Sequence, residues 1–332
     1  MLSLCVIARD EEALLPACLA SVRGLVDEIV VCDTGSADRT VELARAAGAR
    51  VVRRTWDEDF SAARNAALEA SSGDWILVLD ADERLSRAGH EVLRSALQDD
   101  DFDLGMLPLH NASRLDADEA EVLSGELRRG EAVLLPRLFR RDPTLRWEGR
   151  VHETPRTWLA QGRRIRSIPA DLVHLGCVPE VREAKGKDAR NLALLERRCA
   201  DEPDNPVIWG YLARERLGAG DLQGALAASE RGWQALLPAL AQRPRPTFVS
   251  LTSLRAHLLL GTGQVDQALT TLAQARSWGA RHPNLELLGG LALEESGRFD
   301  EAAASYERAL AMPGPFAEEA LPDAQGPGCQ AR

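Results

Sequence analysis

The sequence predicts an α/β domain with a mostly parallel, doubly wound sheet, followed by an all-α array of helical repeats. Short apolar runs alternate with amphipathic segments over residues 2–79, which is typical of strands joined by helices. After Pro179 the chain changes to Ala- and Leu-rich helical segments, whose turn glycines recur at a spacing of 34 residues. A length of 332 residues also favours two domains. We therefore expect the first domain at 1–183, the repeats at 184–313 and a flexible tail at 314–332.

Four strands are expected in the first part of the chain, at residues 2–8, 28–32, 50–53 and 75–80. These runs are short and apolar, which indicates strands buried in a sheet. Helices are expected between them, the first two ending near Gly24 and Gly48 and the third covering 57–70. Strands joined in this way by helices run parallel.

The rest of the first domain has a weaker pattern. A helix is expected at 86–97 and strands at 102–110 and 132–140, with a polar stretch at 111–118 between the two strands. Pro136 lies inside the last of these strands. Because proline cannot donate a backbone hydrogen bond, this strand is expected either at the edge of the sheet or with a bulge.

The strand at 75–80 ends in a cluster of carboxylates, Asp80, Asp82 and Glu83. Open α/β sheets bind their ligands outside the carboxyl ends of the strands, where this cluster lies. Crowded carboxylates repel one another unless a cation neutralises them, and Mg²⁺ or Mn²⁺ takes oxygen ligands and bridges to phosphates. The cluster therefore predicts a metal and diphosphate site. Capping of the next helix by Asp80 and Asp82 is the alternative.

Charged residues also follow the first two strands, at 9–12 and 33–38. Parallel strands place these clusters on the same edge as the one at 80–83, and independent helix caps explain such convergence poorly. The chain has no G-x-G-x-x-G after the first strand and no P-loop sequence. A phosphate at this edge would therefore be held through a metal ion.

Charge and cysteine usage limit the partners and the compartment. A net charge of −11 argues against nucleic acid as the main partner. Six scattered cysteines without a CxxC pair favour a reducing, cytoplasmic location. The apolar N-terminal run is too short for a signal peptide, and no stretch reaches the roughly 18 apolar residues of a transmembrane helix.

Three runs resemble the family 2 glycosyltransferases of the GT-A fold, namely SLCVIARDEE at 3–12, DEIVVCDTGSADRT at 27–40 and DFSAARNAALEASSGDWILVLDADE at 59–83. The branch they resemble is bacterial and carries tetratricopeptide repeats after the catalytic domain. Peptide S-glycosyltransferases of bacteriocin biosynthesis share that layout. The resemblance is dense over residues 1–85 and thinner beyond. Asp10 stands where relatives commonly have Asn, which leaves the choice of nucleotide more open.

The resemblance implies a nucleotide-sugar site on this edge. The residues it implies are Ala8, Arg9, Glu11, Asp33, Arg64, Asn65 and Asp80. In the family, residues after the first strand hold the base and ribose, and a carboxylate at the position of Asp33 accepts a hydrogen bond from the base, typically uracil. Helix capping is the alternative for Asp33, and a solvated position on its helix is the alternative for Arg64.

The resemblance also implies a divalent cofactor, Mn²⁺ or Mg²⁺. Asp82 would ligate the ion directly, and Asp80 would contact the ion or the ribose. His174 resembles the late histidine that completes the metal or phosphate site in many GT-A enzymes. The alternative for His174 is a buried core residue, because Val173 and Leu175 flank it.

Family 2 resemblance implies inversion at the sugar, so a carboxylate must take the acceptor proton on the face opposite the diphosphate. The run WEGRVHE at 147–153 resembles the acceptor-side His-Glu element of these enzymes. Glu153 is the expected base, with Glu148 as the second candidate. The alternative is that Glu153 forms a surface ion pair with Arg150 or Arg156.

The helical region predicts tetratricopeptide repeats. Its turn glycines are Gly220, Gly263 and Gly297. The last two are 34 residues apart, which is the tetratricopeptide period, and the first two are 43 apart. The excess is expected in a loop around Pro238, Pro244 and Pro246. Phe299 and Tyr306 are expected to fill the gap between helix pairs.

Two functions from different classes follow. The first is a metal-dependent inverting hexosyltransferase that takes sugar from a nucleotide diphosphate donor, with UDP favoured, to a peptide or protein, a saccharide or a lipid. The second is a non-catalytic scaffold whose repeats bind a protein partner. Intact Asp80, Asp82, Arg9 and Asp33 favour the first, because a scaffold has no reason to keep a repulsive carboxylate cluster. The repeats are expected either to hold the acceptor or to pair two copies of the chain as a homodimer.

Overall fold

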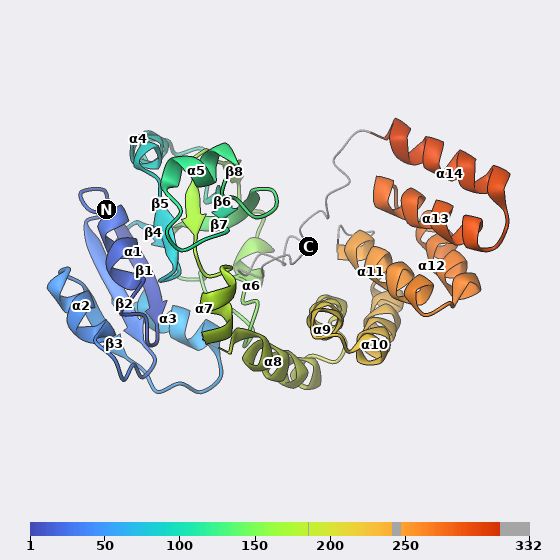
Figure 1. Ribbon diagram of the computed structural model, residues 1–332. Coiled ribbons are helices and arrows are strands. Elements are labelled where there is room, and N and C mark those ends of the chain that lie inside the picture. Colours follow the sequence, from blue (N-terminus) through green and yellow to red (C-terminus); the bar gives the residue numbers. More distant parts are fainter. Residues whose placement is uncertain (185, 241–246, 313–332) are drawn as a thin grey trace. The chain divides into compact units, whose positions relative to one another are not determined.

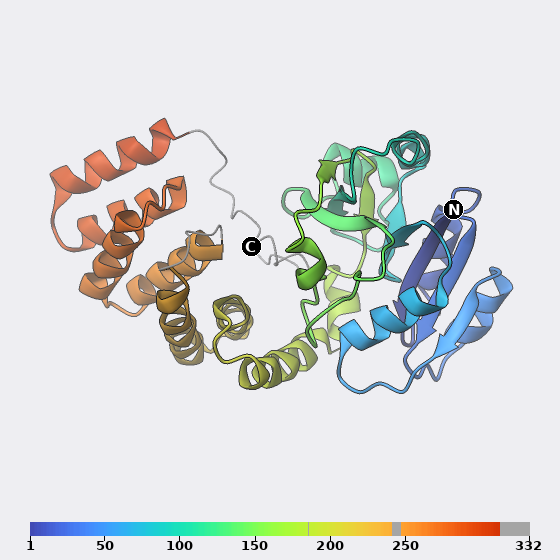
Figure 2. The same ribbon diagram turned by 180° about the vertical axis from the view of Figure 1, so that it is seen from behind.

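The computed structural model describes residues 1–184, 186–240 and 247–312 of the chain (Figure 1, Figure 2). The chain divides into two compact units, one from Met1 to Lys187 and one that begins at Asp188. The first unit contains the sheet, and the second is helical. The tail expected at 314–332 lies outside the described residues.

The parallel part of the sheet has four strands in the order β3-β2-β1-β4. They are β1 (Leu2–Ala8), β2 (Glu28–Asp33), β3 (Arg50–Arg53) and β4 (Trp75–Val78). β1 pairs in parallel with β2 and β4, so that Ala8 lies opposite Asp33 and Cys5 lies opposite Val78. The expected strands and their parallel direction are confirmed. Their carboxyl ends fall on one edge of the sheet, which we call the rim.

Helices cover both faces of this sheet. They are α1 (Leu15–Ser21), α2 (Thr40–Ala46), α3 (Phe60–Ala70) and α4 (Arg87–Ala96). Successive residues of β1 point to opposite faces, so Leu4 packs in the core that contains Leu15 and Leu93, while Cys5 packs in the core that contains Ala67. The observed helices are a few residues shorter than expected. α3 begins after Asp59, whose carboxylate accepts the Ala62 N–H at 3.0 Å.

The sheet continues with antiparallel strands. β7 (Val133–Arg140) lies between β4 and β6 (Leu104–Asn111) and is antiparallel to both. The edge position considered for the strand with Pro136 is therefore wrong. The bulge is confirmed, because Leu138 pairs with Gly105 and Pro136 with Met106, which leaves Arg137 as the extra residue. A bulge redirects one side chain, and here it is that of Arg137.

Three short strands complete the sheet: β5 (Glu83–Leu85), β8 (Ile165–Ser167) and β9 (Leu172–His174). The sequence pattern does not predict them, because three residues are too few for alternation to show. Three short helices lie in the connections: α5 (Glu119–Ser124), α6 (Arg156–Leu159) and α7 (Pro179–Ala184). α5 lies just after the predicted polar stretch, and it starts with a capping box between Asp118 and Glu121.

The second unit is an array of helical hairpins, preceded by α8 (Lys187–Asp201). The hairpins are α9 (Pro206–Gly218) with α10 (Leu222–Leu240), α11 (Thr247–Gly261) with α12 (Val265–Ser277), and α13 (Pro283–Glu295) with α14 (Phe299–Ala311). Gly220, Gly263 and Gly297 all have positive φ at the turns inside the hairpins. The helical array that the repeat spacing predicts is confirmed.

Two expectations about the repeats need correction. Pro238 lies inside α10, so part of the extra length of the first repeat is a longer helix, while Pro244 and Pro246 of the expected loop lie outside the described residues. Phe299 is 67% exposed and does not fill a gap between hairpins. Tyr306 does pack closely, because a Cβ atom placed on Gly290 of α13 would lie 2.2 Å from its ring.

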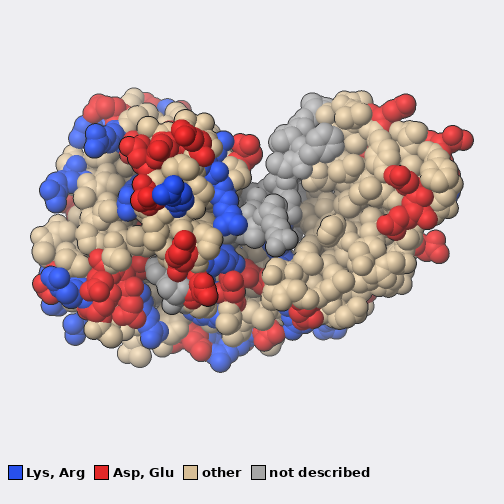
Figure 3. Space-filling model, viewed as in Figure 1, with Lys and Arg blue, Asp and Glu red and all other residues tan. Residues whose placement is uncertain are grey.

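The described residues include no helix with both the length and the hydropathy that crossing a membrane requires. On the face shown in Figure 3, acidic and basic side chains are interspersed over the sheet-containing unit. The helical unit presents mainly uncharged residues on this face, together with scattered acidic ones. The surface charge of the first unit is therefore mixed in this view.

Candidate active site

Hydrogen bonds join the segments that follow β1 and β2 at the rim. The Asp10 carboxylate accepts the Ala37 N–H at 2.7 Å, and the Asp10 N–H donates to Ser36 Oγ at 3.0 Å. The Glu11 N–H donates to Thr40 Oγ1 at 2.7 Å. Asp10 has a φ of 51°, in the left-handed region that Asp enters more readily than most residues. The two charged clusters therefore meet, as their positions after parallel strands predict.

The residues expected to hold the base lie at this junction. Ala8 and Asp33 are buried opposite each other at the ends of β1 and β2, while Arg9 is exposed. Asp33 Oδ1 accepts the Ser36 N–H at 3.1 Å. Because α2 begins only at Thr40, Asp33 supports a loop turn and does not cap that helix.

Asp80 follows β4 and lies between two arginines. Its Oδ1 is 2.8 Å from Arg64 Nη2, and its Oδ2 is 3.4 Å from Arg137 Nη2. Burial opposes ionisation of Asp80, but the charges of Arg64 and Arg137 outweigh it and lower the pKa of the carboxyl. The segment continues into β5, and α4 is capped by Ser86, so helix capping by Asp80 and Asp82 is excluded.

Arg137 is a site residue that the sequence analysis missed. It binds Glu83, whose carboxylate accepts from Nε at 3.1 Å and from Nη2 at 2.5 Å. Burial raises the pKa of Glu83 to about 7, although Arg137 acts in the opposite direction. Pro136 signals the bulge that turns Arg137 toward these acids, but it does not reveal which acids those are.

Asp82 lies beside His174, because β5 and β9 pair with Glu83 opposite His174. His174 Nδ1 is 2.8 Å from Asn111 Oδ1, which assigns the ring proton to Nδ1 and a lone pair to Nε2. Nε2 is 3.6 Å from Asp82 Oδ1 and is buried without a hydrogen-bond partner. Burial lowers the pKa of His174, so the imidazole is neutral at pH 7. His174 is thus a core residue with only one of its two nitrogens satisfied.

Gly176 leaves space in front of this pair. A Cβ atom there would lie 2.1 Å from Asp82 Oδ2 and 2.6 Å from His174 Nε2. Glycine is therefore the residue that leaves the positions of both Asp82 and His174 undisturbed.

Lys187 supplies a cation at the other oxygen of Asp82. Its Nζ lies 2.9 Å from Asp82 Oδ2 and 3.3 Å from the Gly176 carbonyl oxygen. The carboxylates are expected to need a neutralising cation, and side chains of the chain itself supply such cations here, so the carboxylate cluster does not by itself require a metal. The chain provides its own positive charges, from Arg64 and Arg137 at Asp80 and from Lys187 at Asp82.

Asp82 and His174 nevertheless fit a divalent ion. A carboxylate and an imidazole lone pair are both metal donors, and the Asn111 side chain orients the imidazole as outer groups do at metal sites. Asp80 has both oxygens in ion pairs. Among the described residues, no three His, Cys, Asp or Glu side chains form a group that could hold an ion. Its remaining ligands would be water or substrate oxygens.

Glu153 forms a buried ion pair with Arg64 Nε. The two side chains are 10% and 8% exposed, so the alternatives of a surface pair for Glu153 and a solvated position for Arg64 are both wrong. Arg64 thus joins Asp80, at the end of β4, to Glu153, on the loop expected at the acceptor side. Its Nη1 is also buried and has no hydrogen-bond partner.

Asn65 and Glu148 bind within this loop. Asn65 exchanges two hydrogen bonds of 2.9 Å with the backbone of Trp147. Glu148 accepts the Thr157 N–H at 2.7 Å and lies 3.4 Å from Arg156 Nη2. Both side chains therefore stabilise the loop that carries Glu153.

A sequence profile of the family described as Glycosyl transferase family 2 matches residues 3–146. The matched segment runs from β1 through β7 and includes Asp33, Arg64, Asp80 and Asp82. Residues 3–146 therefore resemble the family 2 glycosyltransferases. The mostly parallel sheet is typical of the GT-A fold, and the fold expected from the sequence is confirmed.

Two curated relatives extend the likeness beyond the glycosyltransferase domain. A TPR repeat-containing protein of Synechococcus elongatus is 38% identical over 253 residues, which cover 73% of this chain and 58% of that protein. The SPbeta prophage-derived glycosyltransferase SunS of Bacillus subtilis is 26% identical over 218 residues, which cover 63% of this chain and 48% of that protein. The chain therefore spans about half the length of these relatives.

Solved structures resemble the chain more loosely. Glucosyl-3-phosphoglycerate synthase from Mycobacterium tuberculosis, in complex with Mn²⁺, uridine-diphosphate-glucose and phosphoglyceric acid, is 30% identical over 33% of this chain and 44% of that one, with a TM-score of 0.29. TarS 1–349 from S. aureus is 13% identical over 92% of this chain and 90% of that one, with a TM-score of 0.42. These scores are too low for a residue-by-residue comparison.

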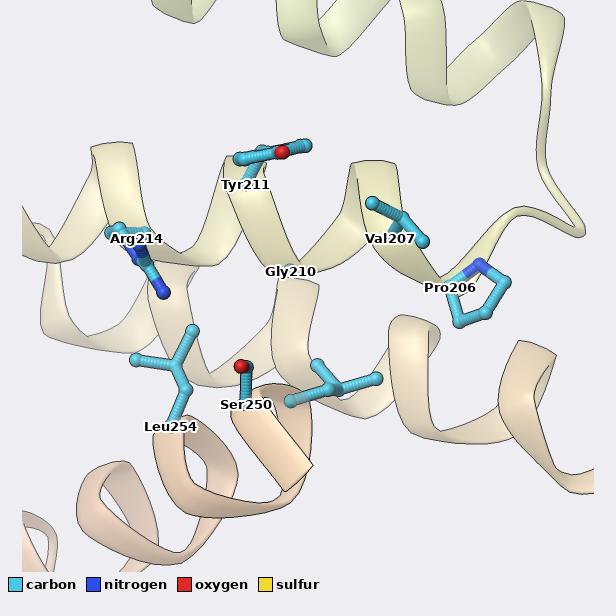
Figure 4. Close-up of a pocket in the computed structure, with 8 residues that line it drawn as sticks. Pro206, Val207, Gly210, Tyr211, Arg214, Ser250 and Leu254 are labelled. Carbon is cyan, nitrogen blue, oxygen red and sulfur yellow. The ribbon is translucent and has the colours of Figure 1, made fainter. Parts of the chain in front are cut away.

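Outside the glycosyltransferase domain, a small pocket lies between α9 and α11 (Figure 4). It is lined by Pro206, Val207, Gly210, Tyr211, Arg214, Ser250, Leu251 and Leu254. In Figure 4 the side chains of Val207, Tyr211 and Arg214 project from one helix, and those of Ser250 and Leu254 from the other. The pocket thus combines apolar walls with one cationic side chain.

Proposed function

We propose that the chain is a metal-dependent, inverting glycosyltransferase that transfers a sugar from a nucleotide diphosphate donor to an acceptor. The observation that carries the proposal is the pair of Asp82 and His174. A carboxylate oxygen and an imidazole lone pair face each other at 3.6 Å, an arrangement that is favourable only with a cation between or beside them. The resemblance of residues 3–146, which include Asp82, to the family 2 glycosyltransferases supports the same class of activity.

Asp82 and His174 are the residues that would hold Mn²⁺ or Mg²⁺. When bound, such an ion supplies positive charge that stabilises the leaving diphosphate. Asp33 supports UDP as the nucleotide, because a buried carboxylate at the end of β2 can accept the N–H of uracil. Ala8, Arg9 and Glu11 belong to the segment that would surround the base and ribose.

Glu153 is the proposed base. In an inverting transfer, the acceptor attacks the anomeric carbon, the bond to the diphosphate breaks, and a carboxylate takes the acceptor proton. Arg64 holds the Glu153 carboxylate in place and contacts Asp80 with the same guanidinium group. Its buried Nη1, which lacks a hydrogen-bond partner, is a donor for an oxygen of the bound substrate.

The acceptor is proposed to be a peptide or protein, with a saccharide or lipid as the other classes. The array of helical hairpins supports a polypeptide, because stacked helical repeats offer extended surfaces on which other proteins bind. In this proposal the repeats contribute to acceptor recognition, and the donor is held by the first unit alone.

A non-catalytic scaffold remains the second candidate, and one observation favours it. Arg64, Arg137 and Lys187 offset the repulsion among the rim carboxylates, so a protein without any metal could also keep Asp80 and Asp82. The presence of these two aspartates is therefore a weaker argument for catalysis than their sequence suggests.

Ligand-dependent thermal unfolding distinguishes the two functions. Mn²⁺ with UDP should raise the unfolding midpoint, since a ligand at a hundredfold excess over its Kd adds about 2.7 kcal/mol to the free energy of unfolding. Asp82→Asn should abolish the part of the shift that depends on Mn²⁺. A screen of UDP-, GDP- and dTDP-sugars for slow hydrolysis then identifies the donor. Absence of any shift with all three nucleotide diphosphates would support the scaffold.

A further inference from the structure

Lys187 is unusual in the composition of this chain as well as in its position. The sequence has two lysines, Lys185 and Lys187, among 40 Lys and Arg residues. The ammonium group of Lys187 lies 2.9 Å from Asp82 Oδ2, and the side chain is 17% exposed. The ion pairs that Asp80 and Glu83 form at the rim use the planar guanidinium of arginine, which suits two-point contacts with carboxylates. Lysine instead places a compact point charge on a flexible stem.

The two oxygens of Asp82 have different environments. Oδ2 accepts from Lys187, while Oδ1 faces the lone pair of His174 at 3.6 Å. An ion held by Oδ1 and His174 would therefore share a single carboxylate with the ammonium group. Two positive groups would then lie within a few ångströms of each other, which costs free energy where burial limits screening.

The local charge follows from these contacts. Lys187 already places a positive charge at Asp82, and Asp80 is already paired with Arg64 and Arg137. A divalent ion that enters alone adds further positive charge beside this ammonium group. A diphosphate that enters with the ion brings the missing negative charge, and its oxygens can accept hydrogen bonds from Lys187.

We propose that Lys187 makes retention of the divalent ion depend on the donor diphosphate, so that ion and nucleotide bind as one unit. The ammonium group weakens binding of the ion alone and strengthens binding of the ion with the diphosphate. This inference rests on the proposed function, because it needs a metal and nucleotide site at Asp82. It adds a donor-binding residue that the family motifs at 3–83 do not contain.

The test is a titration of the full-length chain with Mn²⁺, with free ion followed by its electron paramagnetic resonance signal, in the presence and absence of saturating UDP. In the unmodified chain, UDP should tighten Mn²⁺ binding by about tenfold or more, and Mn²⁺ should tighten UDP binding by the same factor. Lys187→Met should bind Mn²⁺ alone about tenfold more tightly and lose most of the effect of UDP. Arg190→Met, which removes a positive charge from an exposed position on the same helix, should behave like the unmodified chain.

The outcomes separate this inference from the proposed function. If Mn²⁺ and UDP bind but Lys187→Met behaves like Arg190→Met, the inference is overturned and the proposed function stands. If the unmodified chain binds neither ligand, the proposed function itself fails. Lys187→Arg, which keeps the charge, should retain the coupling to within about threefold, and it serves as the test if Lys187→Met does not fold.

Discussion

Replacing Gly176 with alanine tests the site without removing any of its functional groups. Gly176 is not among the glycines with positive φ, so alanine fits the backbone there. Its Cβ atom would lie 2.1 Å from Asp82 Oδ2 and 2.6 Å from His174 Nε2, whereas ordinary contacts begin at 3.4 Å. The Asp82 carboxylate must therefore withdraw by more than an ångström, while both candidate ligands remain in the chain.

A displacement of this size should be costly for the proposed reaction. Misplacing a reacting or binding group by about 1 Å costs roughly 100-fold in rate, which corresponds to about 2.7 kcal/mol of barrier. The assay is turnover of a UDP-sugar at saturating Mn²⁺, together with the Kd of Mn²⁺ in the presence of UDP. Gly218→Ala is the matched control, because no atom lies within 4 Å of a Cβ atom at that position in α9.

The same substitution in an Asp82→Asn background shows whether Gly176 acts through Asp82. If it does, adding Gly176→Ala to Asp82→Asn should lower turnover by less than about threefold relative to Asp82→Asn alone, because both changes affect the same carboxylate. The reasoning is refuted if Gly176→Ala retains turnover and Mn²⁺ affinity within about twofold of the unmodified chain. Thermal unfolding of each variant controls for loss of the fold.

Four further predictions address the base, the metal, the pH dependence and the repeats. Glu153→Gln should slow transfer by about 100-fold and leave UDP binding intact, as measured by turnover and calorimetry; equal loss of both would mean that Glu153 is structural. Asp82→Asn should reduce turnover by about 100-fold, and EDTA should do the same to the unmodified chain; full activity in EDTA would remove the metal from the mechanism. Burial keeps the pKa of His174 in the folded protein below its ordinary value of 6.5, so the chain takes up a proton when it unfolds below that pH. The free energy of unfolding should therefore fall as the pH drops below 6.5, and His174→Gln should make the unfolding midpoint depend less on pH between 6.5 and 5. Midpoints of the variant and the unmodified chain that fall in parallel over this range would contradict the prediction. Gly290→Ala should destabilise the last hairpin by about 1–3 kcal/mol, since its Cβ atom would meet the Tyr306 ring at 2.2 Å; unchanged hydrogen exchange in α13 and α14 would contradict it.

The parallel half of the sheet is predictable because each strand is a local apolar run and each connection is a helix. Strand direction then follows, and with it the gathering of Asp33 and Asp80 on one rim. The family motifs are dense in the same part of the chain. The apolar pattern of the strands and the family motifs therefore predict the same fold for this part of the chain.

The partners of the rim acids were not predictable, because each comes from a distant part of the chain. Arg137 reaches Asp80 across a bulge in β7, and Lys187 reaches Asp82 from 105 residues away in sequence. No periodicity identifies which arginine among many will be buried. The exposed position of Phe299 is a similar case, because its surroundings depend on how the hairpins meet and not on its own helix.

Arg64 and Asn65 are consecutive residues of α3, and each binds one end of the loop that contains Trp147 and Glu153. A small rotation of α3 would therefore move the proposed base and the contact to Asp80 in the same direction. Natural variation beneath this helix, for instance at the buried Ala67, should therefore alter selectivity for the acceptor and efficiency toward the donor together. Evolution of a new acceptor specificity would then be limited by the need to keep the nucleotide-binding contacts in place.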